Sequence, residues 1–420
     1  MPASTAEKST RAHLLSLPVI VAALGYFVDI YDLLLFGIVR VPSLKSLGLN
    51  EQQVSEVGVT ILNWQMGGML IGGIFWGVLG DKKGRLSVLF GSIITYSLAN
   101  IACGFIQDTS LMPATELYKY LRFIAGIGLA GELGAGITLV SEVLPKELRA
   151  IGTSLVAGVG LFGAVAAYFT VEIFGDWRIA YLVGGGLGIG LLLLRVGVIE
   201  SGMFKEVSSQ KHVTKGDFFS FFTNWTRFVR YMKCIGIGLP TWFVISILAT
   251  LSNELGKALG IIETVKPGLA IMWCYVGLAF GDLSSGFLSQ YLASRKKAVA
   301  LMMAFTLVFC LVYLFSGIDS ANTLYALCLA MGFGIGYWAM FVTIGAEQFG
   351  TNLRATAATT VPNMVRGMVI FMTMIYGYFK PSVTPVYAAA IVGVICFTIG
   401  FYCTLTIAET HNKDLDFLEE

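Results

Sequence analysis

The stretch 120–149, YLRFIAGIGLAGELGAGITLVSEVLPKELR, decides which fold we expect for this chain. It is apolar, rich in glycine and about as long as a bilayer is thick, so it predicts a membrane-spanning helix. It nevertheless carries Arg122 near its start and Glu132 at its middle. Charged groups inside a membrane are costly, and they are kept for a function or for a partner of opposite charge. We therefore expect both residues to belong to a functional site.

The composition of the whole chain indicates the same class of protein. Of the 420 residues, 56% are hydrophobic and 13% are charged, and the mean hydropathy is +0.77. Soluble proteins are far less apolar. The net charge of +2 gives no reason to expect nucleic-acid binding. The seven cysteines lie in apolar segments without paired spacing, so we expect neither disulfides nor a metal site.

Apolar segments about twenty residues long recur along the chain, and each predicts one transmembrane helix. Twelve such segments lie near residues 17–39, 55–79, 86–106, 118–142, 150–174, 179–199, 231–255, 267–291, 297–317, 322–346, 356–379 and 384–407. We expect an all-α membrane protein of two six-helix bundles, 1–200 and 231–420. Residues 201–230 form the predicted linker, whose end, DFFSFFTNWTRFVR, is typical of an amphipathic helix at a membrane surface.

The lysines and arginines predict which side of the membrane each loop faces. Most of the 28 fall in segments on the same side as the N-terminus, and such an excess marks the cytoplasm. Residues 1–13 are polar and lack a signal-peptide cleavage pattern. We therefore expect both termini in the cytoplasm and a monomer in the plasma membrane, which is the inner membrane in a bacterium.

The two halves of the chain also share a motif. Glu142 and Arg149 follow the fourth segment, and Glu347 and Arg354 repeat their spacing after the tenth, about half the chain later. Internal duplication of this kind is typical of secondary transporters, whose substrate site lies between the halves near the middle of the membrane.

Several motifs resemble one transporter family. The loop GVLGDKKGR at 77–85 resembles the signature loop of the major facilitator superfamily. The pattern from Arg122 to Glu132 and the one from Glu142 to Arg149 are similar to those of its metabolite:proton symporter, aromatic-acid and sugar-porter branches. So are Asp29-x-x-Asp32 and the tail that begins at Glu409. The second copy of the signature loop is degraded, with Gln290 and Ala293 where Asp and Gly would be expected.

This resemblance implies a twelve-helix transporter that works by alternating access, and it implies a set of gating residues. The cytoplasmic motifs are expected to hold the two halves together and to part during transport. The residues expected to gate are Gly77, Asp81, Gly84, Arg85, Glu142, Arg149, Asp282, Glu347 and Arg354.

Three charged residues at similar depth predict a proton-coupling site. Asp29 and Asp32 are three residues apart and share one face of the first helix. From the helical rise, Asp32 lies roughly 8 Å and Arg122 about 6 Å below the outer membrane boundary. We expect Arg122 to pair with a charged carboxylate and to release it on protonation. The resemblance implies the same role, and a permanent structural salt bridge is the alternative.

Glu132 lies about 15 Å deeper than Arg122, near the middle of the membrane. It is a candidate for a second proton-coupling residue or a substrate contact. Its neighbours Gly131, Gly134 and Gly136 permit close packing of helices. The alternative is that Glu132 is protonated and forms a hydrogen bond to a neighbouring helix, which is a packing role.

Arg366 lies about 16 Å above the start of the eleventh segment. Arginine does not lose its proton in proteins, and its fork of donors suits a carboxylate. Two roles are open, because Arg366 could bind an anionic substrate or pair with Asp282 on the eighth segment. The other expected substrate contacts are Asn63, Gln65, Trp242, Ser246, Tyr337, Trp338 and Asn363.

The combined pattern predicts a symporter that imports a small polar or anionic metabolite. Its expected partners are the substrate, protons and the lipid bilayer, and the proton gradient takes the place of a cofactor. A uniporter or exchanger of the same fold is one alternative, and a membrane sensor that has lost transport is another. The sequence contains no nucleophile with its base, no metal cluster and no phosphate-binding loop that would indicate an enzyme.

Overall fold

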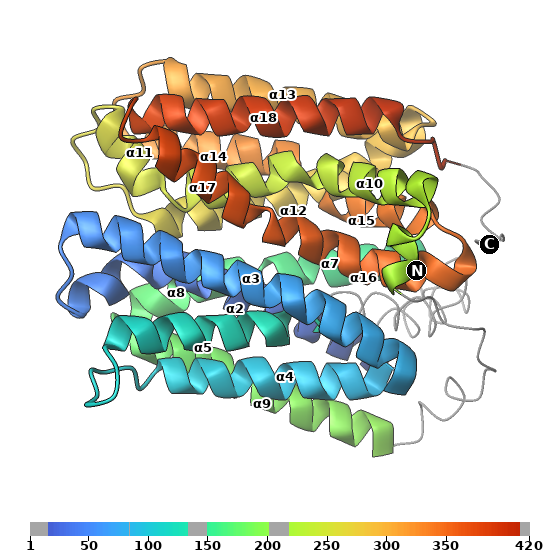
Figure 1. Ribbon diagram of the computed structural model, residues 1–420, viewed down its shortest axis with the longest axis horizontal. Coiled ribbons are helices and arrows are strands. Elements are labelled where there is room, and N and C mark those ends of the chain that lie inside the picture. Colours follow the sequence, from blue (N-terminus) through green and yellow to red (C-terminus); the bar gives the residue numbers. More distant parts are fainter. Residues whose placement is uncertain (1–15, 84, 133–148, 201–217, 412–420) are drawn as a thin grey trace, which may run out of the picture.

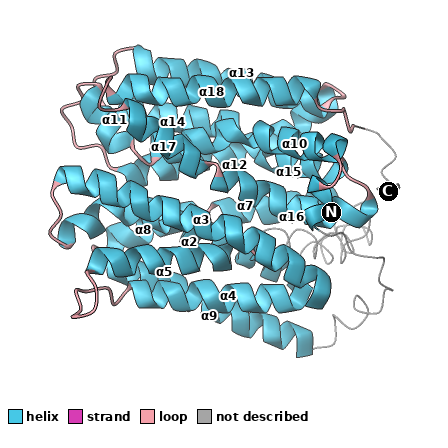
Figure 2. Ribbon diagram, in the orientation of Figure 1, coloured by secondary structure: helices cyan, strands magenta, loops and turns pink. Residues whose placement is uncertain are grey.

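The computed structural model describes residues 16–83, 85–132, 149–200 and 218–411 (Figure 1). In these ranges the chain folds into helices and short connections, and none of the residues lies in a strand (Figure 2). The helices run along the longest axis of the molecule. A bilayer requires such an arrangement, because a helix satisfies its own backbone hydrogen bonds.

The helices of the N-terminal half follow the predicted segments. They are α2 (Leu17–Ser46), α3 (Glu51–Lys83), α4 (Arg85–Cys103), α5 (Ala114–Leu129), α7 (Arg149–Leu161), α8 (Gly163–Phe174) and α9 (Trp177–Glu200). The C-terminal half begins with a 3₁₀ turn, η2 (Phe218–Phe222). It continues with α10 (Trp225–Phe243), the π-helical turn η3 (Val244–Ala249), α11 (Ser252–Ala258), α12 (Pro267–Tyr291), α13 (Arg295–Phe315), α14 (Ala321–Ile335), α15 (Trp338–Glu347), α16 (Thr351–Gly367), α17 (Val369–Phe379) and α18 (Pro385–Thr406).

Ten helices in the described part of the chain are long and apolar enough to cross a membrane. A further apolar helix, Ser87–Cys103, is shorter. Each of the twelve predicted segments overlaps one or more helices, so the all-α prediction is confirmed. Twelve crossings and cytoplasmic termini stay predictions.

The two halves of the chain lie side by side (Figure 1). Between them, α3 packs against α16 and α17, and α12 packs against α2, α7 and α8. We call the end that carries the turn at 47–50 the outer end, following the charge-based prediction; it lies at the left of Figure 1. Because α2 to α9 and α10 to α18 meet along these helices, any site between them is built from both halves.

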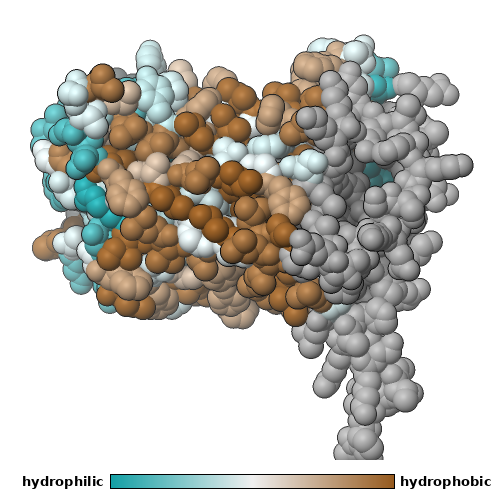
Figure 3. Space-filling model, turned by 90° about the horizontal axis from the view of Figure 1, so that it is seen from below, coloured by the Kyte–Doolittle hydropathy of each residue, from teal (hydrophilic) through white to brown (hydrophobic). Residues whose placement is uncertain are grey.

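Apolar side chains cover much of one long face, and hydrophilic residues gather at its outer end (Figure 3). Large apolar residues with most of their surface exposed include Ile173, Leu193, Phe287 and Tyr378. An apolar surface of this extent marks contact with lipid or another partner. Together with the ten spans, it indicates a protein embedded in a membrane.

The end of the predicted linker differs from the expected amphipathic surface helix. Residues 218–222 form the 3₁₀ turn η2, and the spanning helix α10 already begins at Trp225. The Asn224 side chain caps this helix, because its oxygen accepts from the backbone N–H of Thr226 at 2.9 Å. Phe221 stacks on Tyr231 with ring centroids 4.6 Å apart, which holds the turn against α10. Residues 201–217 lie outside the described residues.

Two glycines, Gly68 of α3 and Gly126 of α5, bring these helices into close contact. A Cβ at Gly68 would overlap the carbonyl oxygen of Phe123, and a Cβ at Gly126 would overlap that of Gln65. Only glycine permits backbones to approach this closely. The contact also brings Arg122 of α5 within reach of Gln65 on α3.

Candidate functional site

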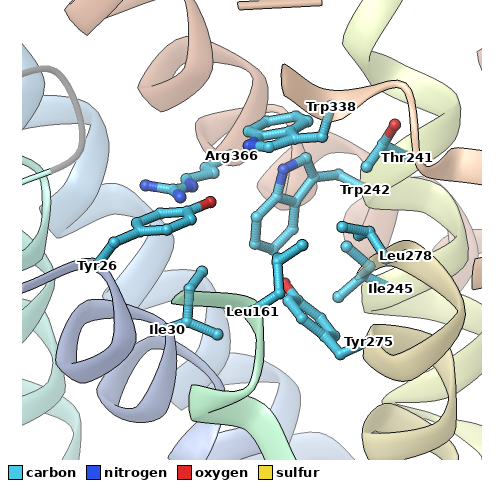
Figure 4. A pocket seen from close by; sticks show the side chains of 10 residues that line it. All are labelled: Tyr26, Ile30, Leu161, Thr241, Trp242, Ile245, Tyr275, Leu278, Trp338 and Arg366. Carbon is cyan, nitrogen blue, oxygen red and sulfur yellow. The ribbon is translucent and has the colours of Figure 1, made fainter. Parts of the chain in front are cut away.

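A cavity lies between the two halves, and its walls come from both (Figure 4). About 240 Å³ of space in it is free of atoms. Because this space includes open solvent and the gaps between side chains, the chemistry of the lining residues, rather than the volume, indicates which ligand the cavity suits. Its lining residues are Tyr26, Ile30, Leu161, Thr241, Trp242, Ile245, Tyr275, Leu278, Trp338 and Arg366.

Among these lining residues, only Arg366 is charged. It is 1% exposed. Its Nη1 donates to Asn363 Oδ1 at 3.3 Å, and its Nε has no hydrogen-bond partner among the described residues. Its guanidinium carbon lies 5.7 Å from the ring centre of Trp242 and 6.0 Å from that of Trp338. Aromatic faces stabilise a buried cation only in part, so Arg366 is prepared to bind an anion.

Two further donors in the cavity wall are also without a partner. The indole Nε1 of Trp242 and the hydroxyl of Thr241 are buried and bond to none of the described residues. In Figure 4, Trp242, Trp338 and Tyr26 surround Arg366. Buried polar groups without a partner are rare and indicate a ligand or water.

Arg122 lies at the centre of a second polar group, inside the N-terminal half. Its Nη1 donates to Asn100 Oδ1 at 2.7 Å, and its Nε donates to Gln65 Oε1 at 3.3 Å. Its Nη2 donates to the backbone oxygen of Asp32 at 3.1 Å. The guanidinium also lies 5.4 Å from the ring centre of Tyr181. Arg122 therefore sits beside Asp32 but contacts its backbone.

The carboxylates of Asp29 and Asp32 are fully buried. None of their four oxygens accepts a hydrogen bond from a described residue. In this conformation no ion pair joins Arg122 to either carboxylate, although Arg122 lies within electrostatic range of Asp32. The exchange with a paired arrangement stays a prediction.

Glu132 forms a buried ion pair that the sequence reasoning missed. Arg195 of α9 donates through Nη1 to Glu132 Oε2 at 3.1 Å and through Nη2 to Oε1. The two side chains are 5% and 2% exposed. The pair rests on α2, because a Cβ at Gly25 would overlap both Arg195 Nη2 and Glu132 Oε1. Gly25 lies one helical turn before Asp29, so this pair adjoins the buried carboxylates.

We expect Arg195→Met to lower the stability of the purified protein by about 3–5 kcal/mol, because Glu132 would be left buried without a partner. The loss will appear as a lower thermal unfolding midpoint in detergent. The matched control is the double variant Glu132→Leu with Arg195→Met, which removes both charges and should recover most of the loss. Equal loss in both variants would contradict a stabilising ion pair.

The predicted substrate contacts divide into two groups. Trp242, Trp338 and Arg366 line the cavity. Asn63, Gln65, Ser246, Tyr337 and Asn363 lie outside its lining. The seven lining residues that the sequence reasoning missed are Tyr26, Ile30, Leu161, Thr241, Ile245, Tyr275 and Leu278.

Two of the residues outside the lining join the halves. Asn63 Oδ1 accepts from the hydroxyl of Thr373 at 2.7 Å, and Asn363 Nδ2 donates to the carbonyl of Ala130 at 2.9 Å. The others satisfy backbone groups within one half. Gln65 Nε2 donates to the carbonyl of Leu33 at 2.9 Å.

Ser246 and Tyr337 likewise bond to the backbone of the C-terminal half. The Ser246 hydroxyl donates to the carbonyl of Trp242 at 2.5 Å, and the Tyr337 hydroxyl donates to that of Ile237 at 3.1 Å. Asp282, the other proposed partner of Arg366, accepts from the backbone N–H of Ala339 at 3.0 Å. It thereby caps the start of α15, and no ion pair joins it to Arg366.

Charged residues join the two halves at the outer end. Arg40 is fully buried and donates to the carbonyl of Thr250 at 3.0 Å and to Asn253 Oδ1 at 2.9 Å. Its Nη1 lies 3.6 Å from Glu254 Oε1. Lys380 Nζ contacts Glu254 Oε2 at 2.7 Å and reaches Ser55 of the other half at 3.0 Å. We call Arg40, Glu254 and Lys380 the outer latch.

We expect Glu254→Gln to open the outer end more often, because it removes the carboxylate shared by Arg40 and Lys380. Coupling of this kind is worth about 1–3 kcal/mol, or roughly a 5- to 150-fold change in the balance of states. The measurement is the rate at which a membrane-impermeant maleimide modifies a cysteine introduced at Thr373, which is 2% exposed. The control is Glu172→Gln, whose pair with Lys266 is about half exposed and should matter little. An unchanged rate in Glu254→Gln would contradict a latch.

The predicted cytoplasmic gate is described only in part. Gly84 and Glu142 lie outside the described residues, as do the side chains of Asp81, Arg85 and Arg149. Gly77 is described, and a Cβ there would touch Thr360 of α16 at 3.6 Å, where the two halves meet. The gating role of Gly77, Asp81, Gly84, Arg85, Glu142 and Arg149 stays a prediction.

The second copy of the gate is described more fully. Glu347 forms an ion pair with Arg295 at the start of α13. Arg354, the predicted partner, lies within electrostatic range of the same carboxylate. Both arginines therefore act on the charge of Glu347, and Arg295 forms the ion pair with it.

Beyond the last spanning helix, Glu409 fixes the tail to the start of α13. Its carboxylate accepts from the Ser294 hydroxyl and from the backbone N–H of Arg295 at 3.2 Å and Lys296 at 3.3 Å. Partial burial raises the pKa of Glu409, but these bonds and one from the His411 N–H lower it more, to about 2. A lowered pKa means that the contact stabilises the fold at neutral pH and is lost only as the pH falls toward 2.

Comparisons with known proteins agree with this architecture. A sequence model described as Major Facilitator Superfamily matches residues 22–374. The chain is 26% identical over 380 residues to a niacin transporter of Acinetobacter baylyi, covering 80% of this chain and 81% of that protein. It is 25% identical to a gentisate transporter of Corynebacterium glutamicum, covering 78% and 73%. Its fold is similar to that of the proton:xylose symporter XylE, with a TM-score of 0.68 and 15% identity over 97% of this chain and 98% of that one.

Proposed function

Since this chain belongs to the major facilitator superfamily, we propose that it is a proton-coupled symporter of a small carboxylate. The substrate binds in the cavity between the halves and crosses the membrane by alternating access. The observation that carries this proposal is the buried guanidinium of Arg366, which has no ion pair among the described residues.

One buried cation in an otherwise uncharged cavity favours a substrate with one negative charge. An anion of charge minus one would neutralise Arg366, whereas a neutral sugar would leave its charge uncompensated. The guanidinium fork suits the two oxygens of a carboxylate. The free donors of Trp242 and Thr241 would supply further hydrogen bonds to the same group or to a ring substituent.

The remainder of the cavity favours a flat, largely apolar ring. Trp242, Trp338, Tyr26 and Tyr275 present aromatic surface, and the aliphatic residues fill the gaps between them. Aromatic side chains bind planar rings by stacking or by edge contacts. The relatives named for niacin and gentisate point the same way, since each of these compounds is a single aromatic ring that bears a carboxylate.

Proton coupling is assigned to Asp29, Asp32 and Arg122. A buried carboxylate that accepts no hydrogen bond holds a negative charge only at a high cost. We propose that these carboxylates carry the proton in the conformation described here and that Arg122 turns toward one of them when the proton leaves. A facilitative uniporter is the second candidate, and it would keep the same cavity without this exchange.

The outer latch indicates which conformation of the transport cycle is described here. Because Arg40, Glu254 and Lys380 join the halves, we propose that the cavity is closed toward the outer end in this conformation. Substrate uptake then requires these contacts to break and the cytoplasmic gate to close. When two bundles move around a central site, the contacts at the outer end and those at the cytoplasmic end must form in turn.

A ligand screen tests the substrate proposal. Purified protein would be heated with benzoate, nicotinate or gentisate, and with the neutral amides benzamide and nicotinamide. We expect at least one carboxylate to raise the unfolding midpoint and the amides to leave it unchanged, because a ligand stabilises the state that it binds. The same carboxylate should exchange by counterflow in proteoliposomes. Equal shifts with the amides would contradict an anion site at Arg366.

A further inference from the structure

The interior of the N-terminal half contains an unusual number of buried polar atoms without partners. They are both carboxylate oxygens of Asp29 and of Asp32, the hydroxyls of Tyr96 and Ser97, Asn100 Nδ2 and Arg195 Nε. All of these side chains are 5% exposed or less. Folded proteins leave few such groups unpaired, so a cluster of them requires a physical explanation.

These atoms form a connected group. Asp29 and Asp32 lie on one face of α2, and a Cβ at Gly184 of α9 would overlap Asp32 Oδ1, so this carboxylate faces α9. Tyr96 is on α4, where its backbone N and Cβ lie against Gly128 of α5 and its ring edge lies against Gly188 of α9. Four charged groups act on its hydroxyl, and they are Glu132, Asp32, Arg195 and Asp29. The Tyr96 hydroxyl therefore lies within electrostatic range of the two aspartates and of the Glu132–Arg195 pair.

Ser97 extends the group along α4. A Cβ at Gly188 of α9 would overlap the Ser97 hydroxyl and touch the edge of the Tyr96 ring. The two hydroxyls thus face α9, the helix that carries Arg195. Neither hydroxyl donates to a backbone carbonyl, as the buried hydroxyls of Tyr313 and Tyr337 do, so both are without a partner among the described residues.

The cluster is separate from the substrate cavity. None of its residues lines the cavity, although Tyr26 and Ile30 on either side of Asp29 do. Asp29 lies within electrostatic range of Arg366 on one side and of Glu132 on the other. It is therefore the residue at which the substrate site and the polar cluster meet.

We propose that the N-terminal half contains an internal proton path that runs from Asp32 and Asp29 past the hydroxyls of Tyr96 and Ser97 to the Glu132–Arg195 pair. Buried water links these groups, as it does for unsatisfied polar atoms in other proteins. In each step one O–H bond breaks as the next one forms, so a proton moves along the chain of water and hydroxyl groups without any net change in them. The inference rests on the proposed function and adds the route by which the coupled proton passes from the aspartates to the Glu132 carboxylate, which accepts it as a hydrogen bond from Arg195 breaks.

The path is bounded by ionisable and polar groups from each neighbouring helix. The groups outside the path itself include Gln65 of α3, Arg122 of α5, Tyr181 of α9, Arg366 of α16, Tyr26 and Tyr31 of α2 and Tyr275 of α12. Tyr96 acts as a proton-relay group in this arrangement. It holds water between the carboxylates and Glu132, and it does not contact the substrate.

The test is Tyr96→Phe, which removes the hydroxyl and keeps the ring. Wild type and variant would be reconstituted in proteoliposomes and supplied with the labelled carboxylate, benzoate, nicotinate or gentisate, that exchanges fastest in the wild type. We expect net uptake driven by an inward proton gradient to fall by about tenfold or more, at the low end of the effect of a positioned proton-transfer group. Counterflow at equal pH should stay within about twofold of wild type, because exchange needs no proton release.

Tyr313→Phe is the matched control. It removes a buried hydroxyl that donates to the carbonyl of Leu248 at 3.1 Å in the C-terminal half, so it should alter stability without separating the two assays. Ser97→Ala is a second, smaller test of the path, and it should lower net uptake in the same selective way. Thermal unfolding of each purified variant reports whether it is folded.

The outcomes separate this inference from the proposed function. If gradient-driven uptake and counterflow of Tyr96→Phe both match wild type, or if both fall together, the path is wrong while the symporter proposal stands. If wild-type uptake does not respond to the gradient, the symporter proposal fails and the path fails with it.

Discussion

Uphill accumulation of substrate will be lost in Asp29→Asn and in Asp32→Asn. Both carboxylates are fully buried and accept no hydrogen bond from a described residue, so neither has an evident structural partner to lose. Asparagine keeps the shape and cannot exchange a proton. A variant that cannot take up and release the proton will be unable to use the gradient, and we expect the initial rate of gradient-driven uptake to fall by a factor of about 100 or more.

Counterflow at equal pH separates coupling from binding. At least one of the two variants should retain exchange close to that of wild type, because an asparagine resembles the protonated aspartate. Asn100→Asp is not a suitable control, since Asn100 accepts from Arg122 at 2.7 Å. Ser284→Ala is suitable, because its hydroxyl donates only to a backbone carbonyl of α12 and is exposed. Undiminished accumulation in both aspartate variants would refute the switch.

Substrate binding will be lost in Arg366→Met. The guanidinium is the one charged group among the described residues that line the cavity, and its loss leaves a carboxylate in an apolar site without a partner. Removing one member of a buried charge pair costs about 2–5 kcal/mol, which corresponds to an affinity lower by a factor of roughly 30 to several thousand. The measurement is the dissociation constant of the best carboxylate from the screen.

Two controls define the role of the arginine. Arg366→Lys keeps the charge but loses the fork and the stacking on Trp242 and Trp338, so it should bind more weakly than wild type and more tightly than Arg366→Met. Asp282→Asn tests the alternative partner, and it should leave affinity nearly unchanged because Asp282 caps α15. Wild-type affinity in Arg366→Met would show that the anion lies elsewhere.

The sequence was sufficient for the class of fold. Apolar segments of spanning length predicted where the helices lie, because a bilayer imposes both length and composition on them. Close packing was predicted at Gly131, Gly134 and Gly136; a Cβ at Gly131 would meet Ser92 and Trp76, and the other two glycines lie outside the described residues. Pro240 favours an interruption in the outer half of its span, but the π-helical form of the turn η3 depends on how neighbouring helices pack.

The sequence predicted three of the ten residues that line the cavity. Arg366, Trp242 and Trp338 stood out because a charge or a large aromatic in an apolar span is conspicuous. Ile30 and Leu161 gave no such signal, since an aliphatic residue in a spanning helix faces lipid and the interior equally well. Only the placement of the helices decides which of them line the cavity.

Arg195 shows most clearly what the sequence could not provide. It lies close to the end of a predicted span, where arginines commonly extend toward the membrane surface. Sequence spacing gave no link to Glu132, which lies 63 positions away. A charge inside the membrane such as that of Glu132 nonetheless indicates that a neighbouring helix carries an opposite charge.

The most direct test of the central claim is uptake into proteoliposomes with and without an inward proton gradient. The labelled carboxylate selected by the screen would be added outside, and its internal concentration would be followed over time at matched membrane potential. A proton-coupled symporter will accumulate the carboxylate above its external concentration only when the gradient is present. Equal uptake in both conditions, levelling off at the external concentration, would contradict the proposed coupling and identify a facilitative uniporter.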